Sequence, residues 1–217
     1  MCHGFTGDKY EWGRFPRLAN ECNKEEFDAL FFDFSGSGEN ERVPITVFKQ
    51  IQDLESVFKW VQDRGYKKIA VLGLSFGGLT ALGAELTGIK AYIFWAPFFF
   101  LHTTEDHSDW FRDLNKGPVK IPTSGEGEPV IIDMSFMTDF AKVRVKSNLK
   151  KLDIPTLMVQ GTSDQSVPYE FTRKAFSLLP KNKNNKLVEI KDATHDFEGK
   201  HLNEFINHTI LWLKDYL

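Results

Sequence analysis

Gly73-Leu74-Ser75-Phe76-Gly77 lies between a short apolar run, Lys68 to Leu72, and the helix-forming residues Leu79 to Leu82. In this order of strand, tight turn and helix, the serine of a G-x-S-x-G pattern projects its hydroxyl from the edge of a sheet. The strained turn and the close helix leave space only for small residues two positions before and after the serine. Both of these positions are glycines. The stretch therefore predicts an α/β fold in which Ser75 is a nucleophile.

Short apolar runs alternate with longer amphipathic segments along most of the chain, which is typical of a parallel sheet flanked by helices. Apolar stripes at three- and four-residue steps predict a helix from about Ile45 to Gly65 and a C-terminal helix that includes Leu202 to Leu213. The expected strands are Ala29 to Phe34, Lys68 to Leu74, Ala91 to Ala96, Thr156 to Gln160 and Leu187 to Lys191.

The alternation breaks after Pro97 and resumes at Lys151. An insertion after the carboxyl end of a strand sits above the crevice where such sheets bind ligands. We therefore expect residues 98–150 to form a cap over the active site, with 1–97 and 151–217 as the core domain.

Within this insertion, Val119 to Ile121 and Val130 to Asp133 predict a small hairpin across a glycine-rich turn. A helix is expected to follow from about Phe136 to Val145. The insertion also holds a group of potential metal ligands that lacks the spacing of a helical zinc motif, so no metal site is expected. This group is His102, Glu105, Asp106 and His107.

A serine hydroxyl is a weak nucleophile at neutral pH, so Ser75 needs a general base, and the base needs an acid that orients it. Asp164 and His195 each follow the end of an expected strand, which places both at the same edge of the sheet as Ser75. The order Ser, Asp, His is the one expected for this arrangement. The rival histidines and acids are less suitably placed; they are His3, His102, His107, His201, His208, Asp153, Asp192 and Asp196.

Backbone and aromatic groups near Ser75 complete the candidate site. The Phe76 N–H lies at the N-terminus of the expected helix, where it can donate a hydrogen bond to the oxyanion that forms during acyl transfer. Trp95, Phe98 and Phe99 follow a strand end at the crevice, so they are candidates for substrate binding. Ordinary core packing is an equal alternative for these aromatic residues.

Composition excludes several classes of protein. The 217 residues, 41% hydrophobic and 26% charged, fit one globular domain with a substantial core. The formal charge of -3 and the lack of a basic run argue against nucleic acid or an anionic membrane surface as a partner. The longest apolar run, Ala91 to Leu101, is about half the length that spans a bilayer. Two cysteines, Cys2 and Cys22, form no disulfide framework, which favours a reducing, cytoplasmic location.

Together these residues resemble the α/β-hydrolase superfamily, and within it the small capped carboxylesterases that include cinnamoyl (feruloyl) esterases and monoacylglycerol-lipase-like enzymes. The resemblance covers nearly the whole chain. It implies that Ser75 is the nucleophile, His195 the general acid/base and Asp164 its orienting acid, with the N–H groups of Phe5 and Phe76 as the oxyanion hole. The motifs that support it are His3-Gly4-Phe5-Thr6-Gly7, Phe32-Asp33-Phe34-Ser35-Gly36-Ser37-Gly38, Gly73-Leu74-Ser75-Phe76-Gly77-Gly78 and the loops of Asp164 and His195.

The resemblance implies a serine esterase that cleaves small to medium carboxylic esters through an acyl-enzyme intermediate, with no cofactor or metal. Peptidases and thioesterases of the same fold share this triad, and a non-catalytic binding protein of the fold is a further alternative. The dehalogenases and epoxide hydrolases of the superfamily have Asp as nucleophile, so Ser75 argues against both.

One part of the family pattern is nearly missing. In the family, a strand precedes the loop that begins at His3 and lies in the middle of the sheet, yet only Met1 and Cys2 stand there. Each buried backbone group left without a hydrogen bond by its omission would cost about 1–3 kcal/mol. We therefore expect Met1 and Cys2 to be the end of this strand, with roughly 25 residues upstream of Met1 completing it.

Overall fold

The computed structural model describes residues 1–101, 112–123, 127–181 and 184–217. At its centre, four parallel strands form a sheet in the order β1-β2-β5-β6. Strands of a parallel sheet are covered on both faces and consist of continuous apolar runs, as in β2, where every residue is buried. The strands predicted at 68–74, 91–96, 156–160 and 187–191 are confirmed as β1 Ala70–Leu74, β2 Ala91–Trp95, β5 Thr156–Gly161 and β6 Asn185–Ile190.

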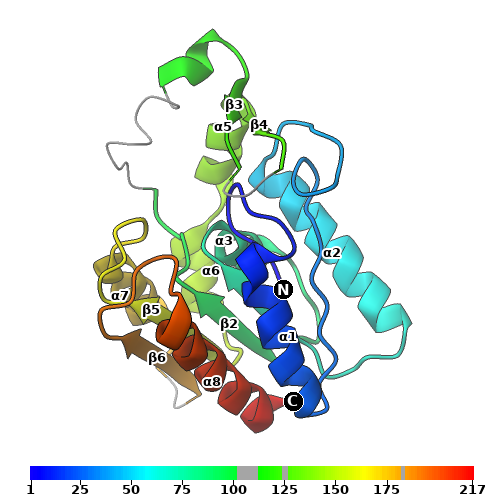
Figure 1. Cartoon of the computed structure of the whole chain (residues 1–217), viewed down its shortest axis with the longest axis vertical. Helices are drawn as coiled ribbons and strands as arrows, with labels where there is room; N and C mark the ends of the chain where they lie inside the picture. The colour runs from blue at the N-terminus through cyan, green and yellow to red at the C-terminus, as the bar shows by residue number, and fades with distance from the viewer. Residues whose placement is uncertain (102–111, 124–126, 182–183) are drawn as a thin grey trace.

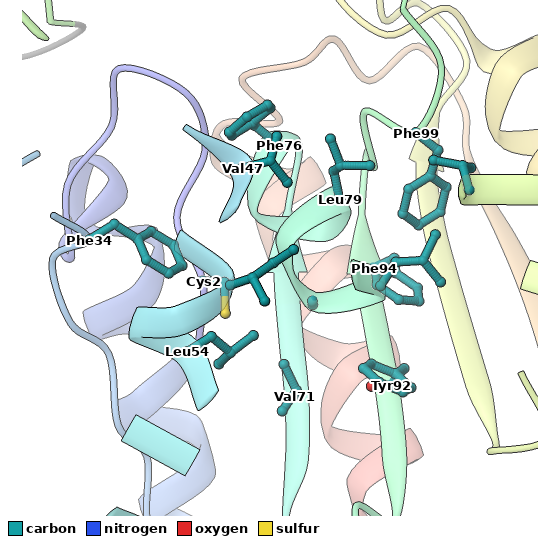
Figure 2. Packing of buried hydrophobic residues seen from close by; sticks show 14 of the residues in the cluster. Cys2, Phe34, Val47, Leu54, Val71, Phe76, Leu79, Tyr92, Phe94 and Phe99 are labelled. Atoms are coloured by element: carbon teal, nitrogen blue, oxygen red, sulfur yellow. The ribbon is translucent and has the colours of Figure 1, made fainter. Parts of the chain in front are cut away.

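The sheet separates two hydrophobic cores, because successive residues of a strand point to opposite faces. Tyr92 and Phe94 of β2 face the first core, which Figure 2 shows, and Ile93 and Trp95 face the second. Helices α2 and α3 contribute to the first core, while α1 and α8, side by side in Figure 1, cover the second. The bounds of these helices are α1 Arg14–Lys24, α2 Val47–Asp63, α3 Phe76–Gly83 and α8 Gly199–Tyr216.

The two helices predicted from apolar stripes are confirmed as α2 and α8. The Thr46 hydroxyl caps α2 by accepting the Lys49 N–H at 3.2 Å, and Gly65 follows the end of the helix with a φ of 89°. Helix α1 is not among the predicted elements, although its buried residues Phe15, Leu18 and Cys22 recur at three- and four-residue steps. The other helical segments are α5 Met134–Lys142, α6 Val145–Lys151, α7 Tyr169–Leu178 and the 3-10 turns Glu11–Gly13 and Leu114–Lys116.

The segment 29–34 is not a strand, which corrects the prediction made for it. A strand forms only where extended backbone lies alongside to exchange hydrogen bonds. On this side of β1, Cys2 makes one parallel bridge to Gly73, and the Met1 amine donates to the Leu30 carbonyl at 2.7 Å. Beyond these contacts, a groove of about 560 Å³ is lined by both the segment and β1, so the two do not pair.

The described parts of the insertion contain the predicted hairpin, since β3 Val119–Ile121 pairs antiparallel with β4 Val130–Ile132. Helix α5 begins slightly earlier than predicted, because Asp133 caps it by accepting the Ser135 N–H at 2.8 Å. Figure 1 shows the hairpin and α5 at one end of the molecule. The segment that contains His102, Glu105, Asp106 and His107 lies outside the described residues.

Candidate active site

Ser75 occupies the turn between β1 and α3 with φ 50° and ψ -118°, a conformation that is unfavourable for any residue other than glycine. The two glycines of the motif are required by close backbone contacts. A Cβ on Gly73 would lie 2.5 Å from the Gly77 carbonyl oxygen, and one on Gly77 would lie 2.3 Å from the Cys2 carbonyl oxygen. The strained turn therefore depends on both glycines, as the motif predicts.

The structure brings Asp164 and His195 together from the loops after β5 and β6. The Nδ1 atom of His195 lies 2.8 Å from Oδ2 of Asp164, whose side chain is fully buried while that of His195 is 21% exposed. The other carboxylate oxygen accepts the Val167 N–H at 2.7 Å. An ionised carboxylate only accepts hydrogen bonds, so this pairing places the imidazole proton on Nδ1 and leaves Nε2 as a base.

Gln160, at the end of β5, holds Asp164 in place and was not identified from the sequence. Its amide nitrogen donates to Oδ2 of Asp164 at 2.8 Å and to the Val167 carbonyl at 3.1 Å. Its carbonyl oxygen accepts from the Thr172 hydroxyl at 2.7 Å. Gln160 is fully buried. An amide side chain at the end of the buried run Leu157 to Val159 was the available signal, because a buried amide requires partners of this kind.

Ser75 and His195 line the same cavity, which has a volume of about 350 Å³. Among the residues that the structure describes, no hydrogen bond joins the Ser75 hydroxyl to His195; in unliganded active sites such bonds are often long. The walls are mainly apolar. Phe98, predicted to contact the substrate, is one of the lining residues, together with Phe5, Trp12, Phe76, Phe136 and Val167.

Trp95 and Phe99 lie in the hydrophobic cores and not along the cavity, which corrects the expectation that they bind substrate. Trp95 is fully buried, and its indole N–H donates to the Thr209 hydroxyl of α8 at 2.9 Å. Phe99 is 2% exposed and meets the Phe94 ring edge-on at 5.1 Å. The side-chain alternation of β2 explains the placement of Trp95, which falls on the face that α8 covers.

Phe5 and Phe76, the two residues whose N–H groups were expected to form the oxyanion hole, both line the cavity beside Ser75. Their ring centroids are 5.8 Å apart, and Phe136 of α5 packs against both rings, at 5.2 Å and 5.3 Å. Aromatic pairs at such separations attract one another. The three rings therefore hold the loop before α1 close to the start of α3.

Cys2 lies close to the turn that holds Ser75, but its thiol is poorly suited to act as a nucleophile. Burial raises the pKa of its thiol to about 11, so the thiol stays protonated at neutral pH. Within the described ranges, no cluster of three or more His, Cys, Asp or Glu side chains could hold a metal ion. None of the helices formed by those residues has the length and apolar character needed to cross a membrane.

Residues 1–204 match the model of a protein family described as the alpha/beta hydrolase family. A curated relative is the uncharacterized protein YfhR of Salmonella typhimurium, which is 24% identical over 216 residues. The match covers 92% of this chain and 66% of YfhR, so the chain spans just under two thirds of the length of that relative.

Solved structures of esterases and lipases are similar to this chain over nearly its whole length. Est1E from Butyrivibrio proteoclasticus, with ferulic acid bound, is 23% identical with a TM-score of 0.77, covering 99% of this chain and 87% of Est1E. The monoacylglycerol lipase of Paleococcus ferrophilus is 19% identical with a TM-score of 0.76, covering 98% and 91% of the two chains. At these identities the likeness establishes a shared fold.

Proposed function

Because the chain belongs to the alpha/beta hydrolase family, we propose that it is a serine carboxylesterase acting on small to medium carboxylic esters. The observation that supports this most directly is the 2.8 Å contact between His195 Nδ1 and Asp164 Oδ2, beside a cavity that Ser75 also lines. A base oriented in this way is what a serine nucleophile requires.

In the proposed reaction, the Ser75 hydroxyl attacks the ester carbonyl while His195 Nε2 takes its proton. The negative charge that develops on the carbonyl oxygen accepts hydrogen bonds from the N–H groups of Phe5 and Phe76. Collapse of the tetrahedral intermediate expels the alcohol, which receives the proton from His195 and leaves an acyl-enzyme. Water, activated by His195, then releases the carboxylic acid and restores Ser75. Asp164 stabilises the imidazolium at each stage.

The size and lining of the cavity support an apolar acyl group. A volume of about 350 Å³ lies at the lower end of the roughly 300–1,000 Å³ that small-molecule sites occupy. Pro122, Ile132 and Phe136 supply part of the wall, which supports a capping role for residues 98–150. The esterase and lipase structures named above share this fold. The free, buried thiols of Cys2 and Cys22 suit a reducing compartment such as the cytoplasm.

Replacing the nucleophile tests the proposal. Ser75→Ala should lower kcat for p-nitrophenyl esters by roughly 10⁶-fold, because the group that forms the acyl-enzyme is lost. The variant should unfold at the wild-type temperature and should not react with a fluorophosphonate probe. Ser166 lines the same cavity, so Ser166→Ala is a matched control that should still be labelled.

A substrate panel separates the alternatives. Esters of increasing chain length and cinnamate esters should be hydrolysed faster than thioesters or aminoacyl amides with the same acyl group. Faster hydrolysis of a thioester or an amide would indicate a thioesterase or peptidase. A wild-type protein that neither turns over nor accepts the probe would indicate a non-catalytic binding protein of this fold.

A further inference from the structure

A buried ion pair lines the cavity that Ser75 and His195 share, and it belongs to none of the sequence motifs. Glu11 is 2% exposed and Arg14 is 5% exposed. Oε2 of Glu11 accepts from Nη2 of Arg14 at 2.8 Å, and Nε of Arg14 donates to the Glu11 carbonyl at 3.0 Å. Burying two charges is costly unless their remaining donors and acceptors find partners. The partners of this pair therefore indicate what it does.

The carboxylate oxygen of Glu11 that does not bind Arg14 holds the loop that contains Phe5. Its Oε1 accepts the N–H of Gly4 at 2.5 Å, and Gly4 is the residue immediately before Phe5. The loop also closes around this carboxylate, since a Cβ on Gly7 would lie 2.6 Å from the same oxygen. The position of the Phe5 N–H, proposed as an oxyanion donor, is thus set by the Glu11 carboxylate.

The guanidinium nitrogen of Arg14 that does not bind Glu11 holds the loop that contains His195. Its Nη1 donates to the carbonyl oxygen of Asp196, the residue after His195, at 3.3 Å. Its guanidinium group also lies over the ring of Phe197, 4.9 Å from the centroid, a favourable cation–π arrangement. One ion pair therefore connects the two loops that flank Ser75.

We propose that Glu11 and Arg14 are positioning residues, which fix the Phe5 N–H and His195 relative to one another across Ser75. The proposal rests on the esterase function proposed above. Oxyanion donors act on charge that exists only in the transition state, so a small displacement of them slows the chemical step with little effect on substrate binding. The pair should therefore influence kcat much more than KM.

Glu11→Gln is the most direct test. The carbonyl oxygen of glutamine can still accept from Gly4, but its amide group would face Arg14 and leave the guanidinium without a counter-charge. We expect kcat for a p-nitrophenyl ester to fall roughly 10- to 100-fold, less than the loss of a whole oxyanion donor, with KM changed little. The affinity for a boronic acid, which forms a tetrahedral adduct with serine, should fall by the same factor as kcat.

A matched control separates positioning from general stability. Asp53 also accepts a backbone N–H, that of Ser35, at 2.7 Å, and it does not line the cavity. Asp53→Asn should lower the unfolding temperature and leave kcat unchanged. Arg14→Lys is the second variant if Glu11→Gln is poorly folded. It keeps the charge beside Glu11 but cannot reproduce the planar contacts to Asp196 and Phe197, so kcat should fall again.

The possible outcomes distinguish the two proposals. An active wild-type protein with Glu11→Gln and Arg14→Lys at wild-type kcat would overturn this inference alone. The inference would also be overturned if kcat fell only in proportion to the fraction of protein that reacts with the fluorophosphonate. The ion pair would then only stabilise the fold. An inert wild-type protein would overturn the proposed function and this inference together.

Discussion

The two sides of strand β1 are built differently. On one side, β1 pairs with β2 along its whole length, and β5 and β6 extend the same parallel ladder. On the other side, Cys2 alone bridges β1 among the described residues, its N–H donating to Leu72 at 2.8 Å and its carbonyl accepting from Leu74 at 3.0 Å. Backbone pairing along whole strands therefore supports the loops of Asp164 and His195, whereas among the described residues the Cys2 bridge alone joins the start of the Phe5 loop to β1.

On the Phe5 side of β1, polar side chains supply hydrogen bonds to the backbone. His3 is fully buried, and its Nε2 accepts the Phe34 N–H at 3.2 Å. Asp33 accepts the N–H groups of Lys9 at 2.7 Å and Glu39 at 3.1 Å. In the described residues, a ladder distributes support over many equivalent bonds on one side, while on the Phe5 side a few polar side chains add to the bridge made by Cys2. Single substitutions should therefore have distinct effects on the two sides.

After the loss of Ser75 itself, the largest effect is expected on the ladder side, at Asp164. Asp164→Asn should lower kcat by about 10⁴-fold, because an amide in place of the carboxylate favours the wrong imidazole tautomer. Steady-state kinetics with a p-nitrophenyl ester measures this effect. Asp192→Asn, a change to a nearby acid without this contact, is the control and should stay within a few fold of wild type. A mild effect of Asp164→Asn would show that another acid orients His195.

The second-largest effect on kcat in this comparison is expected at Gly77, where the turn after β1 contacts the segment that leads to Phe5. Gly77→Ala would place a Cβ 2.3 Å from the Cys2 carbonyl oxygen and 2.5 Å from that of His3, both backbone atoms that cannot rotate away. The segment leading to Phe5 must then shift, and the loss of one oxyanion donor costs about 10²–10³ in kcat. Kinetics and thermal unfolding should both show the change. Gly127→Ala is the control, because its nearest contact would be 3.6 Å; equal results for the two variants would contradict the interpretation.

The same contrast explains which features the sequence could predict. Strands β1 and β2 are continuous apolar runs, and β5 and β6 contain shorter ones. Ser75, Asp164 and His195 each follow one of these strands, so local pattern and chain order were sufficient. The segment 29–34 has equally suitable residues but is not a strand, because strand formation depends on a neighbour that local sequence does not reveal. Trp95 was misassigned because a large aromatic side chain suits both the lining of a binding site and a hydrophobic core.

The residues that sequence reasoning missed act through distant partners. Gln160 acquires its role from Asp164 and Thr172, and Arg14 from Asp196, which is far along the chain. Nothing in the residue types of Glu11 and Arg14 distinguishes them from charged residues on a solvated helix start. Only their burial and the direction of each donor and acceptor reveal that they connect two loops.

The smallest effect is expected at Asp33, on the side with little backbone pairing, and it should depend on pH. Burial alone would raise the pKa of this carboxyl, but hydrogen bonds from the backbone N–H groups of Glu39 and Lys9, with the Lys9 ammonium, hold it below its usual value. A carboxyl whose folded pKa is lowered contributes stability above its unfolded pKa of about 3.9. That contribution is lost as the pH falls through the lower, folded pKa.

Asp33→Asn should therefore reduce the free energy of unfolding at pH 7 by about 1.5–3 kcal/mol, the range for hydrogen bonds to a charged group. The difference from wild type should shrink as the pH falls below about 4, where the wild-type carboxylate also becomes neutral. Denaturant unfolding between pH 7 and pH 3 measures both effects, and kcat at pH 7 should change only slightly because Asp33 does not line the cavity. If the difference between the two proteins stayed constant with pH, the charge of Asp33 would not be what secures this side, and shape alone would have to explain how Asp33 holds the loop of Lys9.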